Sequence, residues 1–223
     1  MIIRYICISI WLLVAANTAI AGAWPRERGQ LFIAAGGNFL LSEQAQLPVH
    51  YDPTLYLEYG LTDKVSAGLD LHTADAGRIG SVYVFASFPL GDTQAQQKLA
   101  GSLAFGAQMK PDIDTETLMR GGLSWGLGLQ NGWLAVDASA TYGTIDRIFR
   151  PKMDATFGHN WSQNWTTSLQ LQTGQGTTND YYAKIAPSVT YKFRDNLNVH
   201  LGAVHALTGD RGSAMKAETW ITF

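Results

Sequence analysis

Apolar and polar residues alternate along most of the chain. In the hairpin of residues 56–71, Leu57, Leu69 and Leu71 fall on one face, whereas Glu58 and Asp70 fall on the other. Successive side chains of a β-strand point to opposite faces, so this period of two predicts strands with one apolar and one polar face. The same alternation recurs in further segments that are separated by turn residues.

Twelve segments of this kind run from residue 30 to the last residue of the chain. They are Gln30–Leu40, Thr54–Leu61, Lys64–Thr73, Ser81–Leu90, Lys98–Met109, Thr117–Gln130, Gly132–Gly143, Phe149–Trp161, Trp165–Gly174, Tyr181–Phe193, Leu197–Leu207 and Ala214–Phe223. A tilted strand needs about 9–11 residues to cross a membrane, and every segment has about that length or slightly more, except the shorter Thr54–Leu61. Ten strands would require long loops that the sequence does not offer, so twelve is the better count.

The segments between the predicted strands differ in length. One set is longer and contains Leu41–Pro53, Ala74–Gly80, Lys110–Glu116 and Thr144–Ile148; the other contains Thr62-Asp63, Asn131, Ser162–Asn164 and Arg194–Asn196, with Gly91–Gln97 as a longer exception. Short periplasmic turns and longer outer loops are typical of transmembrane β-barrels. The sequence therefore predicts an all-β fold, an antiparallel transmembrane β-barrel with both ends of the chain on the periplasmic side. A soluble barrel with its apolar face inward and a periplasmic sandwich remain as alternatives.

The first residues have the pattern of an export signal. Arg4 precedes an apolar run from Tyr5 to Ala16, and the small residues Ala19, Ala21 and Ala23 follow at the spacing of a cleavage site. The run is too short for a transmembrane helix, which needs about 20 apolar residues. We expect residues 1–23 to be a secretory signal peptide cleaved near 21–23, and residues 24–223 to form a single barrel domain.

Composition supports a location in the envelope. The chain has 23 Gly, 9 Tyr, 9 Phe and 7 Trp, but only 15% charged residues, which favours a surface that faces lipid. Its single cysteine, Cys7, lies in the expected signal, so the mature protein would have no disulfide and no cysteine metal site. The net charge of −2 gives no indication of a nucleic-acid partner.

Three stretches resemble a known group of proteins: Trp24–Gln30, the hairpin Glu58–Asp70 and the C-terminal Phe223. They are similar to small Gram-negative outer-membrane barrels of the transporter or porin-like kind, such as those linked to phenol-degradation pathways. The resemblance implies residence in outer-membrane lipid and passive passage of small solutes. It also implies that the barrel-assembly machinery recognises the last strand through Phe223. It specifies neither the solute nor the oligomeric state.

The polar faces carry charges of both signs, which the alternation places in the lumen. These candidate pore-lining residues are Glu58, Asp70, His72, Arg120, Asp137, Arg150, Lys152, Asp154, Lys184, Lys192, His200, Lys216 and Glu218. In a channel such groups line water and set ion preference. In a closed structural barrel they pair across the lumen and fill it. Twelve strands lie between the roughly eight that side chains fill and the sixteen that leave a wide channel, so both interpretations stay open.

An outer-membrane hydrolase is a further alternative. A serine activated by histidine would need the two side chains to meet, but His159 and Ser162 are an odd number of residues apart and fall on opposite faces. We expect His159 to be an interfacial residue instead. Asp137 and Asp154 become cross-strand neighbours if the loop between them centres near Ile145. Two adjacent carboxylates resemble the site of paired-carboxylate proteases, whereas charges balanced by Arg150, Lys152 or Lys184 are the ordinary explanation of such a pair.

No cofactor or metal site is predicted. Asp112, Asp114 and Glu116 form an acidic stretch in an expected outer loop, which a divalent cation could occupy. A solvated acidic loop is the ordinary explanation of such a stretch. Aromatic residues near the predicted strand ends would form interfacial belts; they are Tyr59, Tyr142, Phe157, Trp161, Trp165, Tyr191 and Phe193.

Overall fold

The computed structural model describes residues 22–41, 50–74, 77–111, 113–176, 179–209 and 212–223. Within these ranges the chain forms twelve strands: β1 (Leu31–Leu41), β2 (His50–Thr62), β3 (Val65–Ala74), β4 (Ile79–Pro89), β5 (Gln97–Lys110), β6 (Ile113–Leu129), β7 (Gly132–Gly143), β8 (Phe149–Asn160), β9 (Trp165–Gln175), β10 (Tyr181–Arg194), β11 (Leu197–Thr208) and β12 (Ser213–Thr222). The predicted strand number and fold class are confirmed. In the described ranges no helix is long and apolar enough to cross a membrane.

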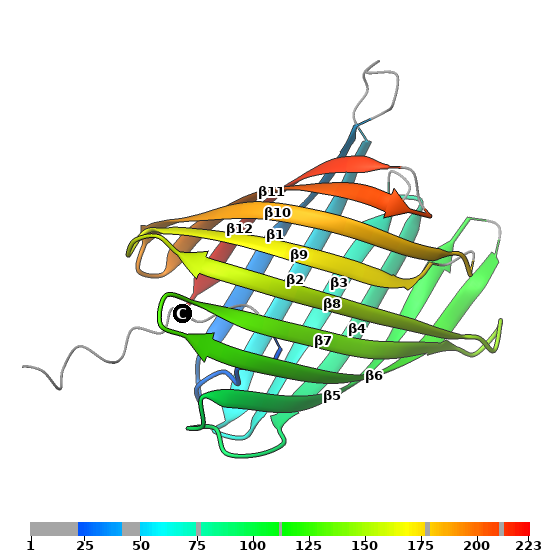
Figure 1. Cartoon of the computed structure of the whole chain (residues 1–223). Coiled ribbons are helices and arrows are strands. Elements are labelled where there is room, and N and C mark those ends of the chain that lie inside the picture. Colours follow the sequence, from blue (N-terminus) through cyan, green and yellow to red (C-terminus); the bar gives the residue numbers. More distant parts are fainter. Residues whose placement is uncertain (1–21, 42–49, 75–76, 112, 177–178, 210–211) are drawn as a thin grey trace, which may run out of the picture.

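The strands form a closed barrel (Figure 1). Each strand pairs with its neighbours in chain order, and β1 pairs with β12. Closure is completed by the last residue, because Phe223 N–H donates to the Leu31 carbonyl at 2.8 Å and Leu31 N–H donates to the Phe223 carbonyl at 3.0 Å. A closed ring leaves no unpaired strand edge, which is the condition for a sheet to lie in lipid.

The two ends of the barrel have different connections. The inner end carries the short turns β2–β3, β6–β7, β8–β9 and β10–β11, together with the longer β4–β5 connection. The outer end carries the remaining connections. The β5–β6 connection is an exception to the expected lengths, because β5 runs to Lys110 and β6 begins at Ile113.

The expectation of a loop over Lys110–Glu116 is therefore wrong. Gln108 pairs with Glu116 across the hairpin, so the strands continue through that stretch. Acidic residues resemble turn residues in a sequence, but the β-branched Thr115 and Thr117 have high strand propensity. Asp52 likewise lies in β2, opposite Asn38, and not in the loop expected over Leu41–Pro53.

The outward face is apolar. Its exposed large side chains include Val84, Leu103, Phe105, Leu123, Leu169, Leu171, Leu201 and Met215. Exposed apolar area that continues around a closed barrel is the surface of a protein embedded in a bilayer.

Aromatic rings gather on this face at both ends. At the inner end Trp165 lies 4.7 Å from Tyr191, measured between ring centroids. At the outer end Tyr142 lies 4.8 Å from Phe149, and Phe39 lies 4.8 Å from Tyr51. Rings in these two positions meet the interfaces of a bilayer. Of the seven aromatic residues expected in these belts, the strand register places Tyr59, Tyr142, Phe157, Trp165 and Tyr191 on the outward face, and Trp161 and Phe193 are 69% and 61% exposed.

Residues 22–30, here called the N-terminal segment, lie inside the inner end of the barrel. Gly29 N–H donates to the Gly60 carbonyl at 2.8 Å, and Gly60 N–H donates to the Gln30 carbonyl at 3.0 Å. A Cβ atom at Gly60 would overlap the Glu27 carbonyl, and one at Gly126 would overlap the Trp24 ring. Glycine thus lets the segment approach the wall closely. Of the expected signal peptide, residues 1–21 lie outside the described residues.

Candidate functional site: the lumen

The strand register places the charged candidates on the inward face. Partners across neighbouring strands share a face, as Tyr56 does with Asp70, Arg120 with Thr141, and His200 with Glu218. By this register the inward set comprises Glu58, Asp70, His72, Arg120, Asp137, Arg150, Lys152, Asp154, Lys184, Lys192, His200, Lys216 and Glu218. Most of these side chains contact one another in a few separate clusters.

The cluster nearest the inner end of the barrel joins the lumen wall to the N-terminal segment. Arg26 Nε donates to Glu58 Oε2 at 2.9 Å, and the two side chains are only 5% and 7% exposed. Ser87 Oγ donates to the other carboxylate oxygen at 3.2 Å. The Arg26 guanidinium also lies 4.3 Å from the centre of the Phe32 ring. Glu58 is therefore neutralised by a residue that the sequence did not single out as part of the lumen.

A second cluster bridges β3 and β6. Arg120 Nη2 donates to Asp70 Oδ2 at 2.8 Å, and its guanidinium lies 4.2 Å from the centre of the Tyr83 ring. His72 Nδ1 lies 4.0 Å from Asp70 Oδ1. Because β4 and β5 separate the two strands in the ring, this ion pair extends into the lumen and narrows it.

A third cluster contains two carboxylates. Asp137 of β7 is the direct cross-strand partner of Asp154 of β8, as predicted from a turn near Ile145. Lys152 Nζ lies 2.8 Å from Asp154 Oδ2, whereas Asp154 Oδ1 is buried without a hydrogen-bond partner. On β10, Lys184 Nζ lies 5.3 Å from the centre of the Tyr182 ring.

A fourth cluster lies on β11 and β12. Lys216 Nζ lies 2.9 Å from Glu218 Oε1, and Trp220 Nε1 donates to Glu218 Oε2 at 3.0 Å. The Trp220 and His200 rings stack with 4.3 Å between centroids. His200 Nδ1 is in turn 2.9 Å from Thr190 Oγ1. The cluster holds the Trp220 ring against the wall.

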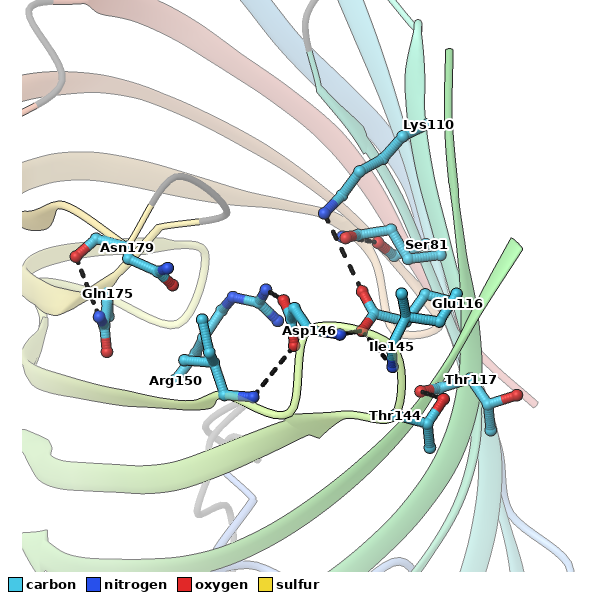
Figure 2. A network of polar contacts seen from close by, with 12 residues as sticks. Ser81, Lys110, Glu116, Thr117, Thr144, Ile145, Asp146, Arg150, Gln175 and Asn179 are labelled. Atoms are coloured by element: carbon cyan, nitrogen blue, oxygen red, sulfur yellow. Dashed lines mark hydrogen bonds and ion pairs between the residues drawn. The ribbon is translucent and has the colours of Figure 1, made fainter. Parts of the chain in front are cut away.

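At the outer end the β7–β8 connection is tied to β6 (Figure 2). Glu116 Oε1 accepts the N–H groups of Ile145 and Asp146, each at 3.1 Å, and Asp146 pairs with Arg150. Lys110 Nζ lies 4.0 Å from Glu116 Oε2. Glu116 thus fixes a loop and is not part of an open acidic stretch. Asp112 lies outside the described residues, and elsewhere in the described ranges no group of three His, Cys, Asp or Glu residues could hold a metal.

At the inner end Lys192 Nζ lies 2.9 Å from Asp195 Oδ1 in the β10–β11 turn. The hydrogen bond from this ammonium group and its charge lower the pKa of the Asp195 carboxyl. The carboxylate is fully exposed in the turn, so the pair lies at the mouth of the lumen.

A cavity of about 580 Å³ lies inside the barrel and reaches the inner turns. Apart from Lys192, which pairs with Asp195, its wall on β9 and β10 is uncharged and internally hydrogen-bonded. Gln172 Nε2 donates to Gln170 Oε1 at 2.6 Å, Gln170 Nε2 donates to Thr156 Oγ1 at 3.1 Å, and the Ser168 and Ser188 hydroxyls are 2.6 Å apart. Alternation with Leu169 and Leu171 puts Ser168, Gln170 and Gln172 on the polar face of the strand, but a search of the sequence for charged groups does not find them.

A hydrolase that uses His159 and Ser162 finds no geometric support. His159 faces outward, and its ring lies 4.5 Å from the Trp161 ring in an edge-to-face arrangement, as expected of an interfacial residue. Ser162 Oγ accepts the N–H groups of Asn164 at 3.3 Å and Trp165 at 3.1 Å. Ser162 therefore stabilises a turn, and the two side chains do not form a catalytic pair.

Comparisons with known proteins identify the fold. No protein-family model matches the chain, and no curated protein matches it. Among solved structures, a KdgM porin is 10% identical with a TM-score of 0.67, over 86% of this chain and 99% of that chain. A NanC porin is 9% identical with a TM-score of 0.62, over 86% and 98%. The outer-membrane phospholipase A of Escherichia coli is 10% identical with a TM-score of 0.53, over 91% and 98%.

These likenesses show a twelve-stranded barrel of the outer-membrane kind. The finer resemblance to barrels of phenol-degradation pathways is not confirmed. Because both porins and a phospholipase share the fold, the fold alone does not separate a channel from an enzyme.

Proposed function

We propose that the protein is an outer-membrane channel for the passive passage of small polar solutes. The observation that carries this proposal is a cavity of about 580 Å³ with a polar wall inside a closed barrel whose outward face is apolar. A polar wall in contact with water is the arrangement by which barrels conduct solutes. The absence of a histidine–serine pair at His159 and Ser162 favours a channel over a hydrolase.

The cavity favours uncharged, hydroxyl-rich solutes. Amide and hydroxyl groups both donate and accept, so Gln170, Gln172 and Ser188 can exchange hydrogen bonds with solute hydroxyls. The charged groups on the cavity wall occur as close pairs, such as Arg26 with Glu58 and Lys216 with Glu218. Paired charges produce a weak net field, which gives little preference for an ion.

An aromatic surface adds to this preference. Trp220 is held in place by Glu218 and His200, and both Trp220 and Trp133 line the cavity. The apolar face of a sugar ring packs on an indole ring, while its hydroxyls reach the amides. One KdgM porin was solved in complex with disordered oligogalacturonate, an acidic oligosaccharide. The cavity wall of this protein is better matched to an uncharged oligosaccharide.

A closed structural barrel is the second candidate. The Asp70–Arg120 ion pair and the N-terminal segment both occupy lumen that a wide channel would leave to water. In that case the ion pairs would serve to hold the interior together.

Recording in planar bilayers tests the proposal. Wild-type protein should give a small, steady conductance, and maltotriose should reduce the current more than an anionic trisaccharide of the same length. Replacing Gln170 and Gln172 by Ala should weaken the effect of maltotriose. The control Thr173→Ala, on the outward face of the same strand, should not. Absence of conductance at every voltage would refute the channel and favour the structural barrel.

A further inference from the structure

Asp137 and Asp154 are cross-strand neighbours on the inward face. Lys152 pairs with Asp154 at 2.8 Å, and Arg120 and Arg150 are paired with Asp70 and Asp146. Asp154 Oδ1 is buried with no hydrogen-bond partner. Burying a carboxylate without an opposite charge is costly, so a second positive group is expected beside this pair.

The backbone of Gly22 lies at this place. A Cβ atom built on Gly22 would be 2.8 Å from Ser124 Oγ and 3.4 Å from Asp137 Oδ1. The Gly22 N–H and the Ser124 hydroxyl both donate to the Asp137 carboxylate. The nitrogen atom of residue 22 is therefore directed at an acid in the lumen wall.

Neighbouring residues fix this position. Ala23 is only 1% exposed, the Trp24 ring covers Gly126, and Arg26 is bonded to Glu58. Trp24 and Arg26 thus anchor the segment on β6 and β2, which keeps residue 22 close to Asp137 of β7.

We propose that export processing cuts the chain after Ala21, and that the new α-ammonium group of Gly22 is the counter-ion of Asp137. Hydrolysis adds water across the Ala21–Gly22 peptide bond, leaving a carboxylate on Ala21 and an amine on Gly22, which takes up a proton. The inference rests on the export signal and the fold, and it holds whether or not the barrel conducts.

The sequence permits a second cut, after Ala23, which the structure disfavours. That cut would remove the Gly22 donor from Asp137 and the buried Ala23 side chain from the wall. A cut after Ala21 keeps both and turns one amide N–H into a charged group with three donors. An α-amino group beside a carboxylate also stays protonated at neutral pH.

The cut is tested by intact-mass measurement and N-terminal sequencing of protein from outer membranes. A chain that starts at Gly22 is expected, and a chain that starts at Trp24 would overturn the inference. A precursor that is never cleaved would overturn it as well.

The ion pair is tested separately by NMR. The α-amine is labelled by reductive ¹³C-dimethylation, which keeps its charge, and its methyl resonance is titrated in folded and in urea-unfolded protein. Its pKa should be higher in the folded protein, and the difference should shrink in Asp137→Asn but persist in Asp70→Asn. Equal pKa values in folded and unfolded wild-type protein would exclude the ion pair, even if Asp137→Asn does not assemble.

Discussion

Charged side chains of the lumen act mainly as pairs. Asp70 with Arg120 and Lys216 with Glu218 are within 3 Å of each other, and each pair also touches an aromatic ring or its N–H. Pairing lowers the cost of placing charge inside a narrow barrel, because the partner replaces part of the lost hydration. The same residues that could select ions therefore also hold the wall in shape.

The Asp70–Arg120 pair gives a test at this scale. Asp70→Asn and Arg120→Gln should each lower the free energy of unfolding by about 1–3 kcal/mol, less than the 3–5 kcal/mol of a fully buried pair. The reason is that the two side chains keep exposures of 23% and 25%. Urea titration of refolded protein measures the loss, and the double variant should lose less than the sum of the two. Additive losses would show that the two charges do not interact.

A second test concerns the outward face. Leu171→Arg and Leu201→Arg should each cost about 2–4 kcal/mol if the side chain lies near the bilayer midplane, because the charge would face lipid. Leu69→Arg should lower the free energy of unfolding by a similar amount. Ser168→Arg, which points into the cavity, is the matched control and should cost less. Equal losses in unfolding from lipid vesicles would mean that the faces are assigned the wrong way round.

The direction of a side chain is predictable from sequence, but its partner is not. Alternation is a local property, so it places Glu58 and Asp70 on one face without any tertiary information. Partners depend on how the strands are offset around the ring. Arg120 is 50 residues from Asp70 in sequence, and Arg26 lies in a segment without alternation. The sequence thus identifies the inward charges but does not tell how they are paired.

Among the elements, β12 has the special task of closing the ring. It pairs with β11 on one side and β1 on the other, and its ladder extends to Phe223, the last residue. Its period of two is regular to the end, which is why the sequence predicts this strand well. The β5–β6 hairpin is predicted less well, because its outer part carries acids that resemble a loop.

Changing Phe223 tests the closing strand. Phe223→Asp should reduce assembly, because it removes an exposed apolar side chain and places a charge beside lipid. The expected result is less folded barrel in outer-membrane fractions, seen as a smaller heat-modifiable band on gels. Phe223→Tyr is the conservative control and should assemble normally. Wild-type levels of Phe223→Asp would show that assembly does not use this residue.

For the whole molecule, closure and an apolar exterior follow from the pattern of the sequence, but the width of the passage does not. Twelve strands set the perimeter of the barrel. The side chains and chain segments inside the lumen then decide how much of its cross-section water occupies. The N-terminal segment and the wall of β9 and β10, in which Lys184 and Lys192 are the charged residues, contribute to those contents. Neither has a strong sequence signal, since one lacks periodicity and the other consists of common polar residues.

Ion preference tests the lumen as a unit. Asp137→Asn combined with Asp154→Asn removes two negative charges and leaves Lys152 without its partner. The conductance should then shift toward anions, since fixed charge acts strongly in a narrow, low-dielectric passage. Reversal potentials in a salt gradient measure the shift. The control Asp195→Asn, at the mouth, should change the reversal potential less, because water and salt screen that site.

The positions of residues 22 and 223 have a practical consequence for handling the protein. Residue 22 touches the lumen wall, and residue 223 is hydrogen-bonded into the sheet. An affinity tag fused to residue 223, or to residue 22 of a chain cut at the proposed place, would compete with these contacts. A short epitope is better inserted between β1 and β2, because Leu41 and His50, where these strands end and begin, lie at the outer end of the barrel. Antibody binding to whole cells would then report the orientation of the barrel without disturbing its closure.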